Sequence, residues 1–276
     1  MRFLIYCILF LVCSIVYIHI LYHLKQSNEE NIYDIDFQNK SHLEKICDMR
    51  CPFVFKAPNT SLLTGDKMKE MNIELNILKE TSKEIEVEGE GEGKKTMRTE
   101  HYAFSEFNKR ALENSSIQDT IRKSEKQYFR PDFTLMNNTD LIHSSPEFTT
   151  PLVSNYNYRN FFHVHDGSVK VRFISPIHID DIPHHFDYEH LHNVSAKEVN
   201  SFTHIKSITL HKGDALYIPS FWWYSFEFVE NTVMIKYQYR SLMNIVAHSP
   251  YYVYSLIAKQ KRIDSDNLKE LKTKID

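Results

Sequence analysis

The sequence is short of glycine, of cysteine and of excess positive charge. It has six glycines and four cysteines among 276 residues, and its formal net charge at pH 7 is −3. Without a basic surface field, nucleic acid is not an expected partner. Cys47 and Cys51 have C-x3-C spacing, but no second Cys or His pair accompanies them at zinc-site spacing, so a zinc site is not expected. Two interpretations stay open for this pair: a disulfide in a lumenal domain, or two free thiols.

The N-terminus carries a long apolar run. Phe3–Tyr22 reads FLIYCILFLVCSIVYIHILY, with no Asp, Glu, Lys or Arg. Twenty helical residues at about 1.5 Å each match a hydrocarbon core of about 30 Å. The run exceeds the apolar core of a cleaved signal peptide, and no small-x-small site follows it. We therefore predict a single-pass signal anchor at residues 1–22 and a polar stalk at residues 23–33.

The sequence indicates less clearly on which side of the membrane the domain lies. Lysine and arginine are nearly balanced across the apolar run, so the positive-inside rule does not decide the orientation. Five N-x-S/T sequons favour a lumenal or extracellular, glycosylated domain. The sequons begin at Asn39, Asn59, Asn114, Asn137 and Asn193.

The remaining length suits about one domain, which we place at residues 34–248. Ile35–Lys56 is typical of a helix, capped by Ser41, followed by a short apolar strand. Residues 86–95 read EVEGEGEGKK and predict a solvated turn or loop. Tyr102–Leu112 and Ser116–Tyr128 are expected to be helical.

From Thr150 onward, short runs of Val, Ile, Phe and Tyr alternate with turn residues. This pattern is typical of an antiparallel barrel or sandwich, so the fold class is expected to be mainly β with flanking helices. The last segment, residues 249–276, predicts a charged helical tail.

Gly213–Tyr224 reads GDALYIPSFWWY. This segment resembles the signature G-D-x-L-Y-I-P-x-x-W-W-H of the JmjC-like cupin family, which contains Fe(II)/2-oxoglutarate oxygenases. Thr150–Pro176 resembles the upstream segment T-P-L-H-x-D-x-x-x-N, followed by an apolar pair, G-x-K and F-x-P. The resemblance extends over most of residues 34–240 and implies a double-stranded β-helix barrel.

The family binds Fe(II) through two histidines and a carboxylate, and a lysine pairs with the cosubstrate. In register, the ligand positions fall on Ser154, Tyr156 and Tyr224, whose neutral hydroxyl groups bind Fe(II) poorly. The lysine position falls on Val169. Lys170 should point to the other face of its strand. Asn160 alone survives of the polar site residues, so the resemblance implies a pseudoenzyme without bound cofactor.

Other histidines offer an alternative metal site. His163 and His165 share a strand face that should point away from the barrel interior. The stretch at residues 178–192 is rich in His and Asp, which could bind Zn, Ni or Cu or could simply be solvated. Its candidate ligands are His184, His185, His190 and His192.

The sequence therefore predicts a non-catalytic binding or scaffolding module held at a membrane by residues 3–22. Its expected partner is a protein or peptide, and the resemblance implies homodimerisation through C-terminal helices. Two alternatives are a 2-oxoglutarate oxygenase that binds Fe(II) through displaced ligands and a structural membrane protein.

Overall fold

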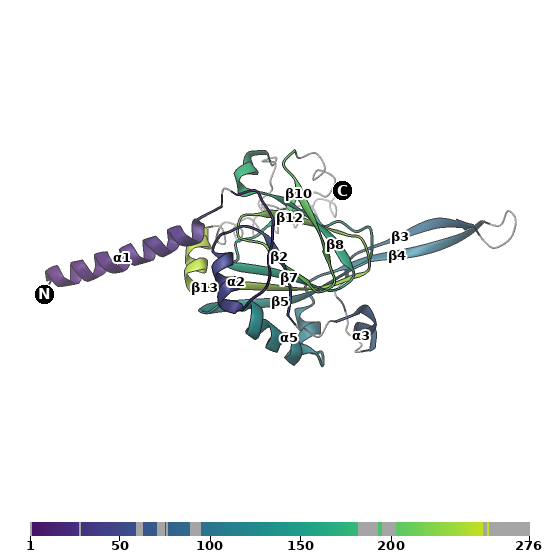
Figure 1. Ribbon diagram of the computed structural model, residues 1–276, viewed down its shortest axis with the longest axis horizontal. Helices are drawn as coiled ribbons and strands as arrows, with labels where there is room; N and C mark the ends of the chain where they lie inside the picture. Colours follow the sequence, from purple (N-terminus) through teal and green to yellow (C-terminus); the bar gives the residue numbers. More distant parts are fainter. Residues whose placement is uncertain are drawn as a thin grey trace, which may run out of the picture.

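Two β-sheets and a set of short helices follow an N-terminal helix that projects from the body of the protein (Figure 1). The computed structural model describes residues 2–27, 29–58, 63–70, 75, 77–88, 95–181, 193–194, 203–250 and 253. Its helices are α1 (Arg2–Leu24), α2 (Lys40–Cys47), α3 (Gly65–Glu70), α4 (Lys109–Glu113), α5 (Gln118–Ser124), the π-helical turn η1 (Glu125–Phe129) and the 3-10 turn η2 (Pro176–Asp181). Residues 242–250 form a further helix.

The strands confirm the β pattern that begins near Thr150. In spatial order the larger sheet is β1 (Tyr33–Asp34), β2 (Phe53–Lys56), β11 (Asp214–Tyr217), β7 (Arg159–Asp166), β13 (Thr232–Ser241), β5 (Thr134–Ser144), β4 (Lys95–Ser105) and β3 (Ile77–Glu88). The smaller sheet is β10 (Lys206–His211), β8 (Ser168–Ile174), β12 (Trp223–Phe228), β6 (Leu152–Ser154) and β9 (Asn193–Val194). The pairings are antiparallel except that of β1 with β2. The expectation of a β fold with flanking helices is thus confirmed.

Strand alternation separates two apolar clusters. On β7, Phe161 packs with the helices that cover the outer face of the larger sheet, whereas Phe162 and Val164 point between the two sheets. The cluster between the sheets also takes Val169 from β8 and Tyr224 from β12. Because neighbouring side chains on a strand point to opposite faces, these pairings decide which residues can line an interior site.

Local expectations in the first half are partly wrong. The cap of α2 is Asn39, whose Oδ1 accepts from the His42 amide at 2.9 Å, rather than Ser41. The predicted helix from Tyr102 begins only at Lys109, because β4 continues to Ser105 and pairs with β5. The expected turn is consistent with the β3–β4 hairpin, although residues 89–94 lie outside the described part.

Residues 23–33 are not a free stalk. His23 is 5% exposed. Glu30 pairs with His178 at 2.8 Å, and Tyr33 lies in β1. The polar composition predicted a spacer, but Glu30 forms an ion pair with the domain and Tyr33 pairs with β2. The tail after residue 250 lies almost wholly outside the described part.

The four cysteines are free thiols, so the second interpretation of the Cys47–Cys51 pair is the one observed. Both of these thiols are buried. Burial raises the pKa of Cys47 to about 12, which keeps this thiol protonated and unreactive.

Candidate functional site

The space between the two sheets changes from polar to apolar along β7 and β13. Asn160, Gln238 and Asn138 are cross-strand neighbours in one row of the larger sheet, and the Asn138 amide donates to Gln238 at 3.2 Å. The next row toward the interior is Phe162, Lys236 and Asp140. Beyond it lie the wholly apolar residues Val164, Met234 and Ile142.

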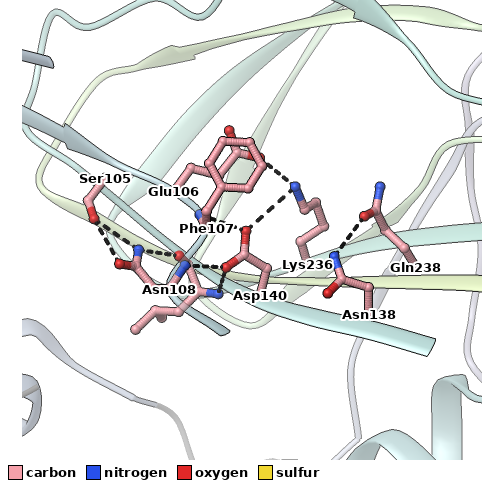
Figure 2. A network of polar contacts seen from close by, with 9 residues as sticks. Ser105, Glu106, Phe107, Asn108, Asn138, Asp140, Lys236 and Gln238 are labelled. Atoms are coloured by element: carbon pink, nitrogen blue, oxygen red, sulfur yellow. Dashed lines mark hydrogen bonds and ion pairs between the residues drawn. The ribbon is translucent and has the colours of Figure 1, made fainter. Parts of the chain in front are cut away.

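Lys236 places a positive charge inside this space. Its side chain is 9% exposed, and its Nζ forms an ion pair with Glu106 and lies 3.7 Å from the Asp140 carboxylate (Figure 2). It also lies 5.7 Å from the centre of the Phe107 ring. Asp140 in turn accepts from the backbone amides of Phe107 and Asn108. The chain thus neutralises its interior cation with its own carboxylates.

Burial raises the pKa of Asp140, although Lys236 and the backbone amides act in the opposite direction. Asp140 therefore holds its proton more tightly in the folded chain than an exposed carboxyl would. This makes the network sensitive to the loss of its cation.

On the smaller sheet, Val169 and Tyr224 face the interior as the resemblance implies. The Tyr224 ring lies 5.5 Å from Phe162 and 5.6 Å from Phe226, measured between ring centres. Burial, followed by the charge of Glu106, raises the pKa of Tyr224 well above its usual range, so the phenol stays neutral. Lys170 points outward and lies 3.9 Å from Glu227, which confirms its predicted face.

The register of β6 corrects the placement of Ser154. Trp223 pairs with Ser154, and Tyr224 pairs with Val153. Directly paired residues share a face, so Val153 lies on the interior face with Tyr224 while Ser154 lies on the opposite face. Counting forward from Thr150-Pro151-Leu152 in the family segment also puts the first histidine position on Val153.

Tyr156 is likewise outside the interior cluster. Its ring packs against Phe221 at 5.5 Å and His248 at 5.2 Å, next to the helix at residues 242–250. By alternation from Val153, the carboxylate position falls on Asn155, which is 8% exposed. This chain has one more residue between Thr-Pro-Leu and Asn160 than the family segment has, and a shift of one residue moves every side chain to the other face.

Asn160 is the one expected polar residue that the structure leaves in the interior. It is fully buried beside Tyr224, and a side-chain hydrogen bond from Asn160 lowers the pKa of the Tyr224 phenol, against the larger effect of burial.

Fe(II) and 2-oxoglutarate, which the resemblance implies, do not fit these side chains. Whether the ligand positions are Ser154, Tyr156 and Tyr224 or, by the face that β6 presents, Val153, Asn155 and Tyr224, they hold no imidazole and no carboxylate. A site for Fe(II) requires imidazole and carboxylate donors. The cosubstrate lysine position is Val169, and the interior cation Lys236 is already paired.

The histidines of the outer face have structural surroundings. His163 packs on Phe129 at 5.9 Å, and the Nδ1 of His165 accepts from the Leu63 amide at 2.9 Å, so both lie away from the space between the sheets as alternation predicted. Among the described residues, no group of three or more His, Cys, Asp or Glu could hold a metal ion. His184, His185, His190 and His192 lie outside the described residues.

Sequence reasoning missed Lys236, Glu106 and Asp140. The sequence did contain one indication, because Lys236 is a charged residue in the largely apolar strand TVMIKYQYRS. It lies two residues after Met234 and therefore points to the same face of the strand. Glu106 could not be found this way, because its contact with Lys236 spans 130 residues.

Comparison with known proteins supports a cupin-like domain in the second half of the chain. The family model described as a cupin-like domain matches residues 163–245. Among solved structures, the X-ray structure of E. coli ycfD has a TM-score of 0.43 and 16% identity, covering 73% of this chain and 53% of that chain. The chain thus spans about half the length of that structure. The search of curated proteins found no match to this chain.

Proposed function

We propose that this chain is a non-catalytic binding or scaffolding module, built on the double-stranded β-helix of cupin-like proteins and held in a membrane by residues 3–22. Its partner is a protein or peptide, and two copies pair through their C-terminal helices. The observation that carries the proposal is the set of side chains on the interior faces of β6, β8 and β12. Val153, Val169 and Tyr224 stand where a metal and its cosubstrate would need charged or imidazole groups.

The membrane part of the proposal rests on α1. It has 23 residues, is long and apolar enough to cross a bilayer, and none of its most apolar window is buried against the domain. An apolar helix in contact with water would be unfavourable by about 25 cal/mol for each Å² of exposed apolar surface. A helix exposed on all sides therefore needs lipid or another apolar partner.

The binding part of the proposal rests on the polar end of the interior. The row of Asn160, Gln238 and Asn138 leads to a surface depression that is also lined by Asn157 and Arg240. Arg240 is oriented by a 2.8 Å hydrogen bond to the Asn157 side chain. Amide and guanidinium groups of this kind suit the backbone and carboxylate groups of a peptide.

The deciding experiment is metal and cosubstrate binding by the full chain in detergent. Protein reconstituted anaerobically with Fe(II) is expected to retain no stoichiometric iron, and calorimetry is expected to show no 2-oxoglutarate binding. About one iron per chain together with bound 2-oxoglutarate would refute the proposal and favour an oxygenase with displaced ligands, such as the histidines at residues 184–192.

Restoring the ligands tests the corrected register. The triple variant Val153→His, Asn155→Asp, Tyr224→His is expected to bind Fe(II), because Val153 and Tyr224 share the interior face and Asn155 directly follows β6 at the same alternation as Val153. The matched variant Ser154→His, Tyr156→Asp, Tyr224→His is expected not to bind it, since residue 154 lies on the opposite face. Iron binding by the second variant alone would show that the register is wrong.

A further inference from the structure

The C-terminal end of α1 is fixed to the domain. The Tyr22 hydroxyl donates to Asp48 Oδ1 at 2.8 Å, and Arg50 donates to the Tyr22 carbonyl at 3.1 Å. The His23 ring packs edge-on against Tyr158 at 5.2 Å. Helix and domain therefore move together, and the direction of α1 sets the orientation of the domain.

No spacer separates the apolar run from these contacts. Phe3–Tyr22 covers about 30 Å as a helix, which is the whole thickness of the hydrocarbon core. Tyr22 and His23 already contact the domain. If α1 spans a bilayer, the edge of the domain from which α1 leaves must therefore lie at the headgroup region.

That edge carries exposed apolar side chains from three segments of the chain. One segment follows α2, one begins β5, and one is the helix at residues 242–250, drawn in yellow beside the end of α1 (Figure 1). Their exposed fractions are Met49 55%, Phe133 95%, Leu135 60%, Met136 53%, Leu242 59% and Val246 40%.

Each segment is tied to the end of α1 by a measured contact. Met49 precedes Arg50, which binds the Tyr22 carbonyl. Ser241 Oγ lies 3.3 Å from His23 Nε2, and Ser241 pairs with Thr134 between Phe133 and Leu135. The three segments thus meet where α1 leaves the domain, and we call their six exposed apolar side chains the apolar rim.

The helix at residues 242–250 is amphipathic with respect to this surface. Asn244 and His248 are fully buried against the domain, and Asn244 donates to the Tyr156 carbonyl at 2.9 Å. Leu242 and Val246, one turn apart, face outward. Single exposed apolar residues are ordinary, but a group of them on one edge marks a binding surface. A helix with one apolar face suits the plane of a membrane interface.

We propose that the apolar rim inserts into the interfacial layer of the bilayer that α1 crosses, so that the domain lies on the membrane in one orientation. The inference rests on the proposed membrane anchoring by residues 3–22. The occupant of the surface is lipid because the rim is continuous with the end of an apolar helix that has the length of a bilayer core. The depression beside Asn138, Gln238 and Arg240 then opens close to the membrane surface.

The test measures depth in the bilayer at single positions of the full chain. In a Cys7→Ala, Cys13→Ala background, an environment-sensitive fluorophore is attached to Leu242→Cys or Phe133→Cys, and the protein is reconstituted into phosphatidylcholine vesicles. Cys47 and Cys51 are buried and stay unlabelled. Insertion by about 5–10 Å should allow strong quenching by nitroxide lipids labelled near the top of the acyl chain.

The matched control is Val229→Cys. Val229 is 54% exposed, like the rim residues, but it precedes β13, whereas Ser241 ends that strand. Ten strand residues at about 3.3 Å each place it about 30 Å from the rim. Lipid quenchers are therefore expected to leave a fluorophore at this position nearly unaffected.

Vesicle flotation and resistance to carbonate extraction test the membrane anchor separately from the insertion of the apolar rim. Anchored protein with lipid quenching at positions 242 and 133 but not at 229 supports the apolar rim. Anchored protein without quenching at any position overturns the rim and leaves the anchor intact. Fluorophores shielded from water but not quenched by lipid would show that a second copy or another part of the chain covers the rim, which also overturns it. Protein that does not float would overturn the anchor and the rim with it.

Discussion

Replacing Lys236 with methionine is expected to destabilise the domain by about 3 kcal/mol. The lysine is 9% exposed and is paired with Glu106 and Asp140, which are 23% and 2% exposed. Methionine retains the packing of the side chain against Phe162 but leaves two carboxylates without their cation. Breaking a buried ion pair on one side costs about 3–5 kcal/mol, and the partial exposure of Glu106 places the effect at the lower end.

The assay is thermal unfolding of the full chain in detergent, followed by near-ultraviolet circular dichroism. For a domain of this size, about 3 kcal/mol corresponds to a decrease in Tm of about 6–12 °C. The matched control is Lys170→Met, because Lys170 is 42% exposed and lies 3.9 Å from Glu227 on the outer face of β8. Its expected effect is below about 1 kcal/mol.

The pH dependence gives this prediction a second readout. The pKa of Asp140 is raised in the folded state, so its contribution to stability is greatest below the unfolded pKa and is lost as the pH rises through the folded pKa. Without Lys236 the folded pKa should rise further, and the variant should recover part of its stability on mild acidification. The double variant Lys236→Met, Glu106→Gln should also recover part of it. A Lys236→Met protein as stable as the wild type at neutral pH would refute the buried network.

Three further outcomes are expected. Gly167→Ala should lower the free energy of unfolding by about 2 kcal/mol or more, because a Cβ there would lie 2.3 Å from the Asn231 carbonyl oxygen. Gly213→Ala, also at positive φ but in open space, should lower it by about 1 kcal/mol. Denaturant unfolding of the two variants compares these values. Burial lowers the pKa of His163 to about 4, so this residue should contribute a loss of stability of up to about 3 kcal/mol between pH 6.5 and 4. His163→Phe should remove this contribution, while the contributions of His23, His165 and His248, whose pKa values burial also lowers, remain. Asn39→Ala should cost about 1 kcal/mol through loss of the α2 cap, and an equal loss in Ser41→Ala would contradict the observed cap.

Much of the β architecture could be predicted from local pattern. The strands around Gly167 and Gly213 alternate apolar residues with turn residues that allow positive φ, and both glycines adopt it. Tyr102 was misassigned because its segment has no strong period, and its strand conformation depends on pairing with β3, where it lies opposite Thr81.

The candidate site shows where sequence reasoning stopped. The identity of Val169 and Tyr224 at the interior was predictable from the matched motif. The placement of Ser154 was not, because counting from the Thr-Pro-Leu start and counting from Asn160 give registers that differ by one residue, and the pairing with β12 shows which side chain faces the interior.

The sequence by itself determined an apolar helix of bilayer length, a β-rich domain and the loss of imidazole and carboxylate groups from the matched motif. These features follow from the local composition and from the periodicity of apolar residues, which can be identified from the sequence alone. The tertiary structure alone decided that His23, Glu30 and Tyr33 contact the domain, and that Lys236 meets Glu106 across 130 residues. It also decided that the segments of Met49, Phe133 and Leu242 meet beside the end of α1. Such contacts depend on the order and register in which the strands pair, and local sequence does not specify that order.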